Sequence, residues 1–175
     1  MPFSLPPQLA ATLIALAERL DAAAIDWVVG GSTARALLGF AATPRDLDLE
    51  VAEDATRTAA SAIGLAAHRD EDSHVTSMRA QGTWGGVEID LIGGLTLHGS
   101  GGNLHADYPL LRRFSKAVSL HGRTIWVAPV EEQIARSVVA GAGDRLDRIA
   151  NERPADYVVD DVYLSLRLAS AAVDV

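Results

Sequence analysis

Several residue types are absent or scarce in this chain of 175 residues, and each absence narrows the range of functions. There is no cysteine, which excludes a disulfide framework, a thiolate nucleophile and a cysteine zinc site. The same absence favours the cytoplasm as the compartment. Aromatic residues make up only 5% of the chain, whereas 49% of it is hydrophobic. This composition is typical of an ordinary globular α/β protein and not of a disordered one.

Basic side chains are almost all of one type, because Lys116 is the only lysine beside fourteen arginines. The net charge of −8 argues against broad, non-specific binding to nucleic acid, which depends on basic residues that neutralise phosphates. A phosphate group on a ligand must therefore be bound by the backbone or by arginine, whose planar guanidinium donates two hydrogen bonds at once. The candidate arginines are Arg35, Arg45, Arg79 and Arg136.

Long apolar runs are also missing. None approaches the roughly 20 residues needed to span a bilayer, and Glu18 and Arg19 interrupt the apolar N-terminal stretch. We therefore expect neither a signal peptide nor a membrane anchor. The length fits one domain over 1–175, either monomeric or homodimeric. The expected parts of this domain are an N-terminal helix in 1–24, a sheet core in 25–128 and a helical part in 129–175.

The stretch from Trp27 to Val51 is predicted to form a strand, a glycine turn, a short helix and a second strand. Gly30 and Gly31 lack β-carbons, so the backbone can approach a bulky anion, and the amides that follow are free to donate hydrogen bonds. Ser32 adds a hydroxyl group. These features predict a phosphate-binding turn.

The second strand carries acidic residues at alternate positions. Because side chains alternate along a strand, Asp46, Asp48 and Glu50 share one face, and the apolar residues between them face the core. Two carboxylates spaced in this way suit Mg²⁺, which proteins usually hold through one or two carboxylates together with substrate phosphates. Mn²⁺ is an equivalent candidate.

A further carboxylate, Asp90, lies within the apolar strand pattern of 87–92, where an unpartnered charge would be costly. A neighbouring cation would remove that cost. Three carboxylates can bridge two metal ions that stabilise the attacking and leaving oxygens of an in-line displacement. Asp90 could also accept the proton of the attacking hydroxyl. This hypothesis requires the hairpin formed by 75–80 and 87–92 to pair with the strand over 46–51.

The chain resembles the nucleotidyltransferase superfamily that includes DNA polymerase β. The resemblance rests on three motifs in order: Gly-Gly-Ser, Asp-x-Asp on a strand, and an Asp on a later strand. Within it, the chain is similar to small stand-alone members of the abortive-infection toxin type and of the type that modifies lincosamides and aminoglycosides. Residues 116–129 resemble the hairpin before the family's Pro-x-Glu helix, and 152–156 resemble its Arg-x-Lys-Asp segment. Two departures are Pro44, where the family often has Arg-x-Thr-x before the first Asp, and Ala155 in place of lysine.

The resemblance implies an α/β (α+β) fold with a mixed sheet, packed helices and a small helical C-terminal part. It also implies transfer of a nucleoside monophosphate from a nucleoside triphosphate to an acceptor hydroxyl, with release of pyrophosphate. The metal and catalytic residues would be Asp46, Asp48 and Asp90. The nucleotide-binding residues would be Gly30, Gly31, Ser32, Arg35 and Arg45.

The acceptor stays open among a small molecule, a tRNA and a protein. A catalytically inactive module that binds nucleotide or a partner through the same fold is the main alternative, and the two departures are its support. A metal-dependent hydrolase is a third possibility, which would release product without labelling an acceptor.

The remaining segments carry four expectations that bear on the site. A helix is expected over 7–22, and 68–74 is expected to form a solvated charged turn. The glycine-rich segment 93–102 predicts a long flexible connection, and His98 and His105 near it are interpreted as hydrogen-bonded loop residues and not as metal ligands. A long helix over 157–172 is expected to pack through one apolar face, or less readily to form a dimer through it. That face consists of Val158, Val162, Leu166 and Ala169.

Overall fold

The computed structural model describes residues 5–99 and 102–171. One eight-stranded mixed sheet runs through it, with β6 paired to β5 beside the main order β3-β4-β5-β2-β1-β8-β7. The strands are β1 (Trp27–Val29), β2 (Asp46–Val51), β3 (His68–Glu71), β4 (Val75–Trp84), β5 (Val87–Gly99), β6 (Gly102–His105), β7 (Lys116–Leu120) and β8 (Arg123–Val127). The helices are α1 (Pro7–Ala22), α2 (Gly31–Leu37), η1 (Glu53–Ala55), α3 (Thr56–Ala62), α4 (Tyr108–Phe114), α5 (Val130–Val139), α6 (Gly143–Glu152) and α7 (Asp161–Ala171).

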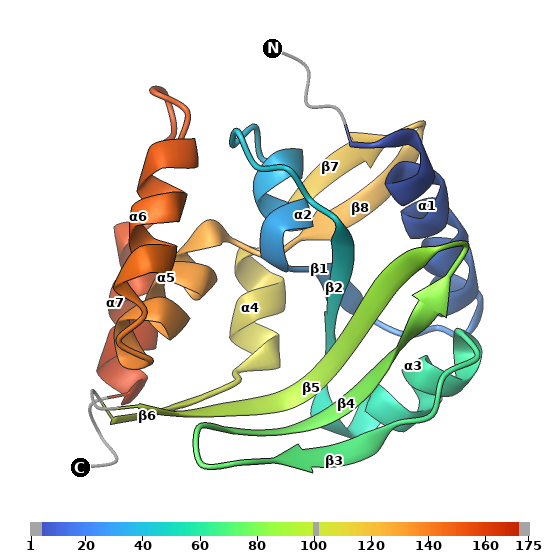
Figure 1. The fold of residues 1–175 in the computed structure, drawn as a ribbon, viewed down its shortest axis with the longest axis horizontal. Coiled ribbons are helices and arrows are strands. Elements are labelled where there is room, and N and C mark those ends of the chain that lie inside the picture. Colours follow the sequence, from blue (N-terminus) through green and yellow to red (C-terminus); the bar gives the residue numbers. More distant parts are fainter. Residues whose placement is uncertain (1–4, 100–101, 172–175) are drawn as a thin grey trace.

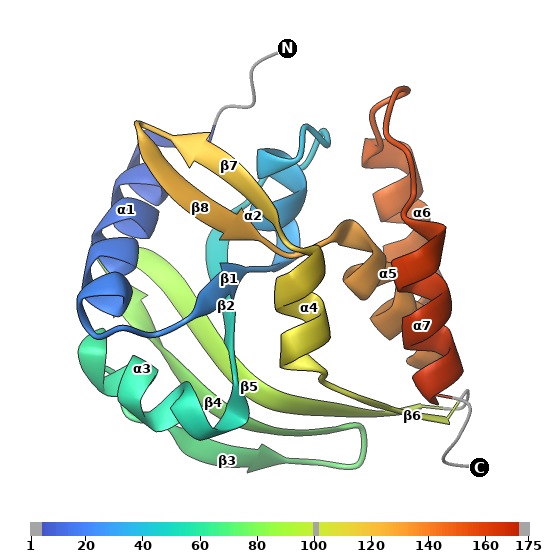
Figure 2. The ribbon, with the colours of Figure 1, turned by 180° about the vertical axis from the view of Figure 1, so that it is seen from behind.

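Helices cover both faces of the sheet. Figure 1 shows α1 and α3 on one side and α5, α6 and α7 together on the other. The first side is apolar: leucines at helical spacing along α1 pack with alanines of α3 against Leu47 and Leu49 of β2. On the second side, Tyr163 of α7 and Leu111 of α4 pack with Val28 of β1. Figure 2 shows α4 between the sheet and α7.

Strand pairing places β2 at the centre of the sheet. It lies antiparallel to β1 and parallel to β5, with Asp48 directly opposite Asp90. The hairpin of β4 and β5 therefore pairs with the strand over 46–51, as the sequence hypothesis required. The predicted helix over 7–22 and strand over 46–51 are confirmed with the same bounds.

Two predicted connections are wrong. Residues 68–71 of the expected charged turn form the strand β3, whose pairing with β4 satisfies its backbone while its side chains stay largely exposed. The expected flexible connection over 93–102 is largely strand as well: β5 continues to Gly99, and β6 begins at Gly102. Residues 100 and 101 of that segment lie outside the described residues. His98 and His105 consequently lie on strands, where they hydrogen-bond to Thr76 and Thr96.

The predicted packing face of the last helix is also wrong. Val158, Val162 and Leu166 are exposed by 82%, 64% and 47%, and Ala169 is exposed too. The buried face of α7 instead carries Tyr163 and Arg167. A polar face can be buried here because both side chains bind the buried Glu132 of α5, which satisfies their hydrogen-bonding groups. Residue 172 lies outside the described part.

Among the described residues, no helix has the length and apolar character needed to cross a membrane.

Candidate active site

The site begins with a row of carboxylates across the middle of the sheet. On β2, Leu47 and Leu49 are completely buried, so the alternating Asp46 and Asp48 project from the opposite, partly open face. The parallel pairing with β5 sets Asp48 beside Asp90 and Asp46 beside Glu88. Residues opposite each other in register share a face, so these four carboxylates and that of Glu50 lie on one face of two neighbouring strands. The sequence hypothesis did not include Glu88, although its alternation with Asp90 was visible.

The glycine turn lies against the second of these carboxylates. The Gly30 amide donates a hydrogen bond of 2.8 Å to the Asp48 carbonyl, which fixes the end of β1 on β2. A β-carbon on Gly31 would lie 1.6 Å from Oδ2 of Asp48, and the φ of Gly31 is +57°, a conformation that favours glycine. Gln133 of α5 donates to the Gly31 carbonyl at 3.0 Å. The turn, the carboxylate and α5 therefore form one connected unit.

Several negatively charged side chains surround Asp48. Burial first, and then the nearby carboxylates of Asp46, Asp90 and Glu50, together raise the pKa of Asp48 to about 6 against the opposing charge of Arg136. A divalent cation between Asp46 and Asp48 would supply the positive charge that this cluster lacks. The two carboxylates on one face, beside a glycine that leaves them space, fit the usual coordination of Mg²⁺ by one or two carboxylates and substrate phosphates.

The third predicted carboxylate has a different partner. Arg79 of β4 donates from Nε to Oδ1 of Asp90 at 2.7 Å and from Nη2 to Oδ2 at 2.5 Å. The structure thus brings Asp90 next to Asp48 in the sheet but engages both of its oxygens with a guanidinium group. Within 5–99 and 102–171, no three His, Cys, Asp or Glu side chains converge as a metal site. The residues therefore fit one cation held by Asp46 and Asp48, and they do not present Asp90 to a second.

A cleft of 670 Å³ opens above these carboxylates. Its floor includes Asp46, Asp48 and Gly31, with Ser32 at the start of α2. Arg145 and Arg148 of α6 line the opposite wall and are exposed. The sequence hypothesis missed these two arginines, which stand three residues apart on a helix and so lie on one face of it. Their spacing was visible, but no local pattern indicated which side of α6 faces the sheet.

The four arginines proposed from the sequence occupy different environments. Arg35 lines the cleft, but it is only 6% exposed and binds Glu152 at 2.7 Å and Gln133 at 2.5 Å. Arg79 binds Asp90. Arg136 is held by carboxylates, as described below. Arg45, just before β2, lines the cleft, is exposed and has no hydrogen-bond or ion-pair partner among the described residues.

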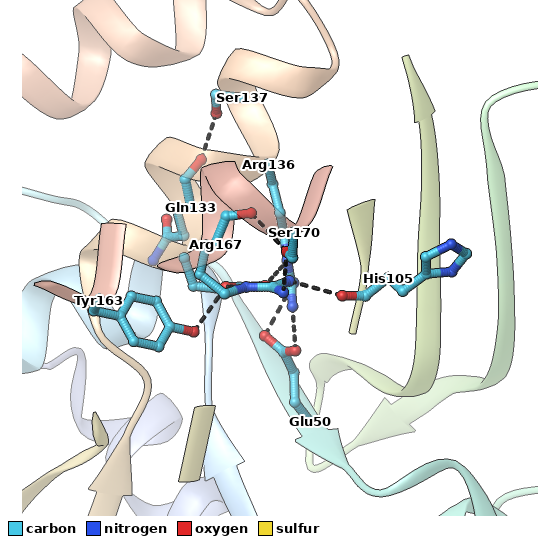
Figure 3. Close-up of polar contacts among 9 residues, drawn as sticks. Glu50, His105, Gln133, Arg136, Ser137, Tyr163, Arg167 and Ser170 are labelled. Carbon is cyan, nitrogen blue, oxygen red and sulfur yellow. Dashed lines mark hydrogen bonds and ion pairs between the residues drawn. The ribbon is translucent and has the colours of Figure 1, made fainter. Parts of the chain in front are cut away.

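A buried ion network joins the carboxylate strand to the C-terminal helices (Figure 3). Arg136 of α5 binds both oxygens of Glu50 on β2 at 3.1 and 2.6 Å and also contacts Glu132 at 2.9 Å. Glu132 in turn accepts hydrogen bonds from Arg167 and Tyr163 of α7. Burial alone would raise the pKa of Glu132, but Arg136, Arg167 and Tyr163 outweigh it and lower the pKa to about 2. Glu50 is thus an anchor for α5.

The fold defined by this sheet, with its glycine turn and the carboxylates on β2, is the nucleotidyltransferase fold, which confirms the expected fold class. Among solved structures, the chain is similar to a protein of Thermotoga maritima that is assigned as a nucleotidyltransferase, with a TM-score of 0.70 and 20% identity over 86% of this chain and 97% of that one. At this identity the similarity establishes the fold alone.

Two further solved structures superpose less closely. The antibiotic-resistance factor ANT(2'')-Ia matches with a TM-score of 0.47 and 17% identity over 92% of this chain and 85% of that one. The lincosamide antibiotic adenylyltransferase LnuA, bound to lincomycin, matches with a TM-score of 0.45 and 13% identity over 95% of this chain and 98% of that one. The sequence matches no protein family and no curated protein.

Proposed function

We propose that this protein is a divalent-metal-dependent nucleotidyltransferase that transfers a nucleoside monophosphate from a nucleoside triphosphate to an acceptor hydroxyl. One observation carries the proposal: Gly31 is packed against Asp48 at the floor of a cleft, with Asp46 on the same face and Asp90 in register on the next strand. A phosphate-binding turn beside a pair of cation-binding carboxylates is the arrangement needed to hold a metal-bound triphosphate.

The residues of the cleft divide into two groups by role. The amides of Gly31 and Ser32 and the Ser32 hydroxyl would hold the β and γ phosphates, whereas the amide of Gly30 is already bonded to the Asp48 carbonyl and fixes the turn. Asp46 and Asp48 would hold Mg²⁺ or Mn²⁺. When bound, the cation would neutralise charge on the phosphates and polarise the α-phosphate. Arg45, which is exposed and unpaired in the described part, would bind the triphosphate from the edge of the cleft.

In the proposed reaction, the acceptor oxygen forms a bond to the α-phosphorus, and the bond from that phosphorus to the αβ-bridging oxygen breaks. Pyrophosphate leaves with the bridging oxygen and its electron pair. The acceptor proton passes to a carboxylate of the row, for which Asp90 is the candidate nearest to Asp48 in the sheet. Orientation of the two substrates and electrostatic stabilisation would supply most of the rate.

One observation favours a second candidate, a module that binds nucleotide without catalysis. The ion pair of Asp90 with Arg79 occupies the carboxylate proposed to accept the proton. An inactive module would bind a triphosphate with Mg²⁺ and would tolerate the loss of Asp90, whereas the enzyme would not.

The test is incubation of the purified protein with each α-labelled nucleoside triphosphate, Mg²⁺ or Mn²⁺ and a cell extract. Asp46→Ala and Asp90→Ala serve as site variants, and Asp54→Ala, an exposed acid on η1, is the matched control. We expect label on a small molecule, a tRNA or a protein that disappears in both site variants and persists in the control. Released product without a labelled acceptor would indicate a hydrolase, and nucleotide binding alone would indicate the inactive module. Absence of metal-dependent triphosphate binding would refute the enzyme.

A further inference from the structure

Arg79 reaches Asp90 because of an irregularity in the sheet. Between Thr76 and Met78 the register of β4 against β5 shifts by one residue, so that Arg79 lies opposite Ile92. With the register that precedes the shift, Arg79 would lie opposite Gly93 and would project from the other face of the sheet. Ile92 and Asp90 share a face, and a long side chain can span the diagonal from a position two residues away. The irregularity therefore brings Arg79 onto the face that carries the carboxylates.

The guanidinium group is fully engaged in this position. Nε and Nη2 bind the two oxygens of Asp90, and Nη1 donates to Oδ2 of Asp70 on β3 at 3.0 Å. The side chain of Asp90 is 17% exposed and that of Arg79 is 29% exposed, so solvent only partly screens their attraction. The hydrogen bonds to Asp90 raise the pKa of Arg79, which stays fully charged.

We propose that Arg79 is a positioning residue that holds the Asp90 carboxylate and competes for it with any second divalent cation that binds beside the one held by Asp46 and Asp48. This proposal rests on the proposed function, since the second cation would bind at the proposed nucleotide site. A carboxylate whose two oxygens accept hydrogen bonds from one guanidinium has little capacity left for a cation on the same side. Binding of a second cation thus requires the Arg79–Asp90 contact to open.

Asp70 gives Arg79 an alternative partner when that contact opens. It lies on β3, the edge strand of the sheet, opposite Ser77 and hence on the same face as Arg79. Arg79 can therefore release Asp90 while it keeps the ion pair with Asp70, whose side chain is 38% exposed. Two arrangements of these side chains are therefore available. In one, Arg79 binds both Asp70 and Asp90; in the other, it binds Asp70 alone and the Asp90 carboxylate is open to a cation.

The experiment is titration with Mn²⁺, followed by electron paramagnetic resonance of the free ion, in the presence of α,β-methylene-ATP, which cannot be cleaved at the reacting bond. The variants are Arg79→Gln, Arg79→Lys and the double variant Arg79→Gln with Asp90→Asn. Arg69→Gln is the matched control, because Arg69 pairs with Glu71 on the exposed side of β3. Thermal unfolding of each variant checks that it is folded.

We expect Arg79→Gln to bind the second Mn²⁺ about tenfold more tightly than the wild type, a magnitude common for groups that contact metal ligands. Arg79→Lys keeps the charge but cannot bind both oxygens in the same way. Its affinity for the second Mn²⁺ should lie between those of the wild type and Arg79→Gln. The gain should vanish in the double variant and be absent from Arg69→Gln. Equal second-site affinity in the wild type and both Arg79 variants overturns this proposal alone. Failure of every protein to bind Mn²⁺ with the nucleotide overturns the proposed function and this proposal with it.

Discussion

Oδ2 of Asp48 occupies the space that a side chain on Gly31 would need. A β-carbon at residue 31 would lie only 1.6 Å from that oxygen. The glycine turn and the second carboxylate of β2 consequently cannot vary independently, and a change in either moves the other.

Gly31→Ala should therefore damage both stability and metal binding. We expect a loss of about 1–3 kcal/mol in the free energy of unfolding from the backbone strain at φ +57° alone, and a further loss from the displaced carboxylate. Gly64→Ala is the matched control, because Gly64 has a φ of +76° and nothing within 4 Å of its β-carbon position. Urea unfolding and Mn²⁺ binding measure the two effects. Equal results for both variants would show that contact with Asp48 is unimportant.

Asp48→Asn tests the electrostatic cost of the site in metal-free protein. The pKa of Asp48 is raised from an ordinary 3.8 to about 6, so the folded state binds the proton more tightly than the unfolded state, and this contribution to stability is lost as pH rises through 6. At about 1.4 kcal/mol per pKa unit, Asp48→Asn should be more stable than the wild type by roughly 2–3 kcal/mol at pH 7 and nearly equal to it at pH 4. Urea unfolding with a chelator present measures the difference. A difference that does not change with pH would contradict the assigned burial and charge.

Glu132→Gln should be strongly destabilising because it leaves Arg136 and Arg167 without their shared counter-charge. The side chains of Glu132 and Arg167 are 3% and 2% exposed, and breaking a buried pair of this kind costs about 3–5 kcal/mol. The lowered pKa of Glu132 means that its stabilising effect is present above pH 4.5 and is lost as pH falls through about 2. Glu18→Gln, at a surface pair with Arg123, should cost less than about 1 kcal/mol in the same unfolding assay.

Arg35 and Arg45, both proposed from the sequence as nucleotide-binding, should separate in their effects. Arg45→Gln should raise KM for the nucleoside triphosphate with a change of at most about 0.5 kcal/mol in stability, because Arg45 is exposed. Arg35→Gln should instead lower stability by about 2 kcal/mol or more, because Arg35 is buried against Glu152 and Gln133. Parallel KM and thermal unfolding measurements distinguish the two. A raised KM without a loss of stability in Arg35→Gln would indicate instead that Arg35 binds the nucleotide.

The sequence was sufficient to predict the elements whose apolar residues recur with a clear helical or strand periodicity. Leucines at helical spacing predicted α1, and alternation of acidic and apolar residues predicted β2, in both cases with the observed bounds. The resemblance identified the fold and the carboxylates that the sheet brings together. These features depend on neighbours along the chain or on strands whose pattern is strong.

The parts that failed depend on partners distant in sequence. The charged residues 68–71 form a strand because β4 supplies their hydrogen bonds, which the local composition does not reveal. The apolar face of α7 is exposed because Glu132, about thirty residues earlier, binds the polar side chains of the opposite face. The partner of Asp90 likewise depends on a register shift between β4 and β5 that no sequence pattern indicates.

The central position of β2 has a consequence for how the protein moves. This strand is hydrogen-bonded along both edges, to β1 and to β5, so its amide protons should exchange with solvent only when the sheet itself opens. The arginines of the opposite wall belong to α6, a helix in which Ile149 alone is buried, and we expect such a helix to open at a lower free energy. We therefore expect the amides of β2 to exchange slowly and its carboxylates to keep a fixed geometry. The amides of α6, which would face an acceptor, should exchange faster.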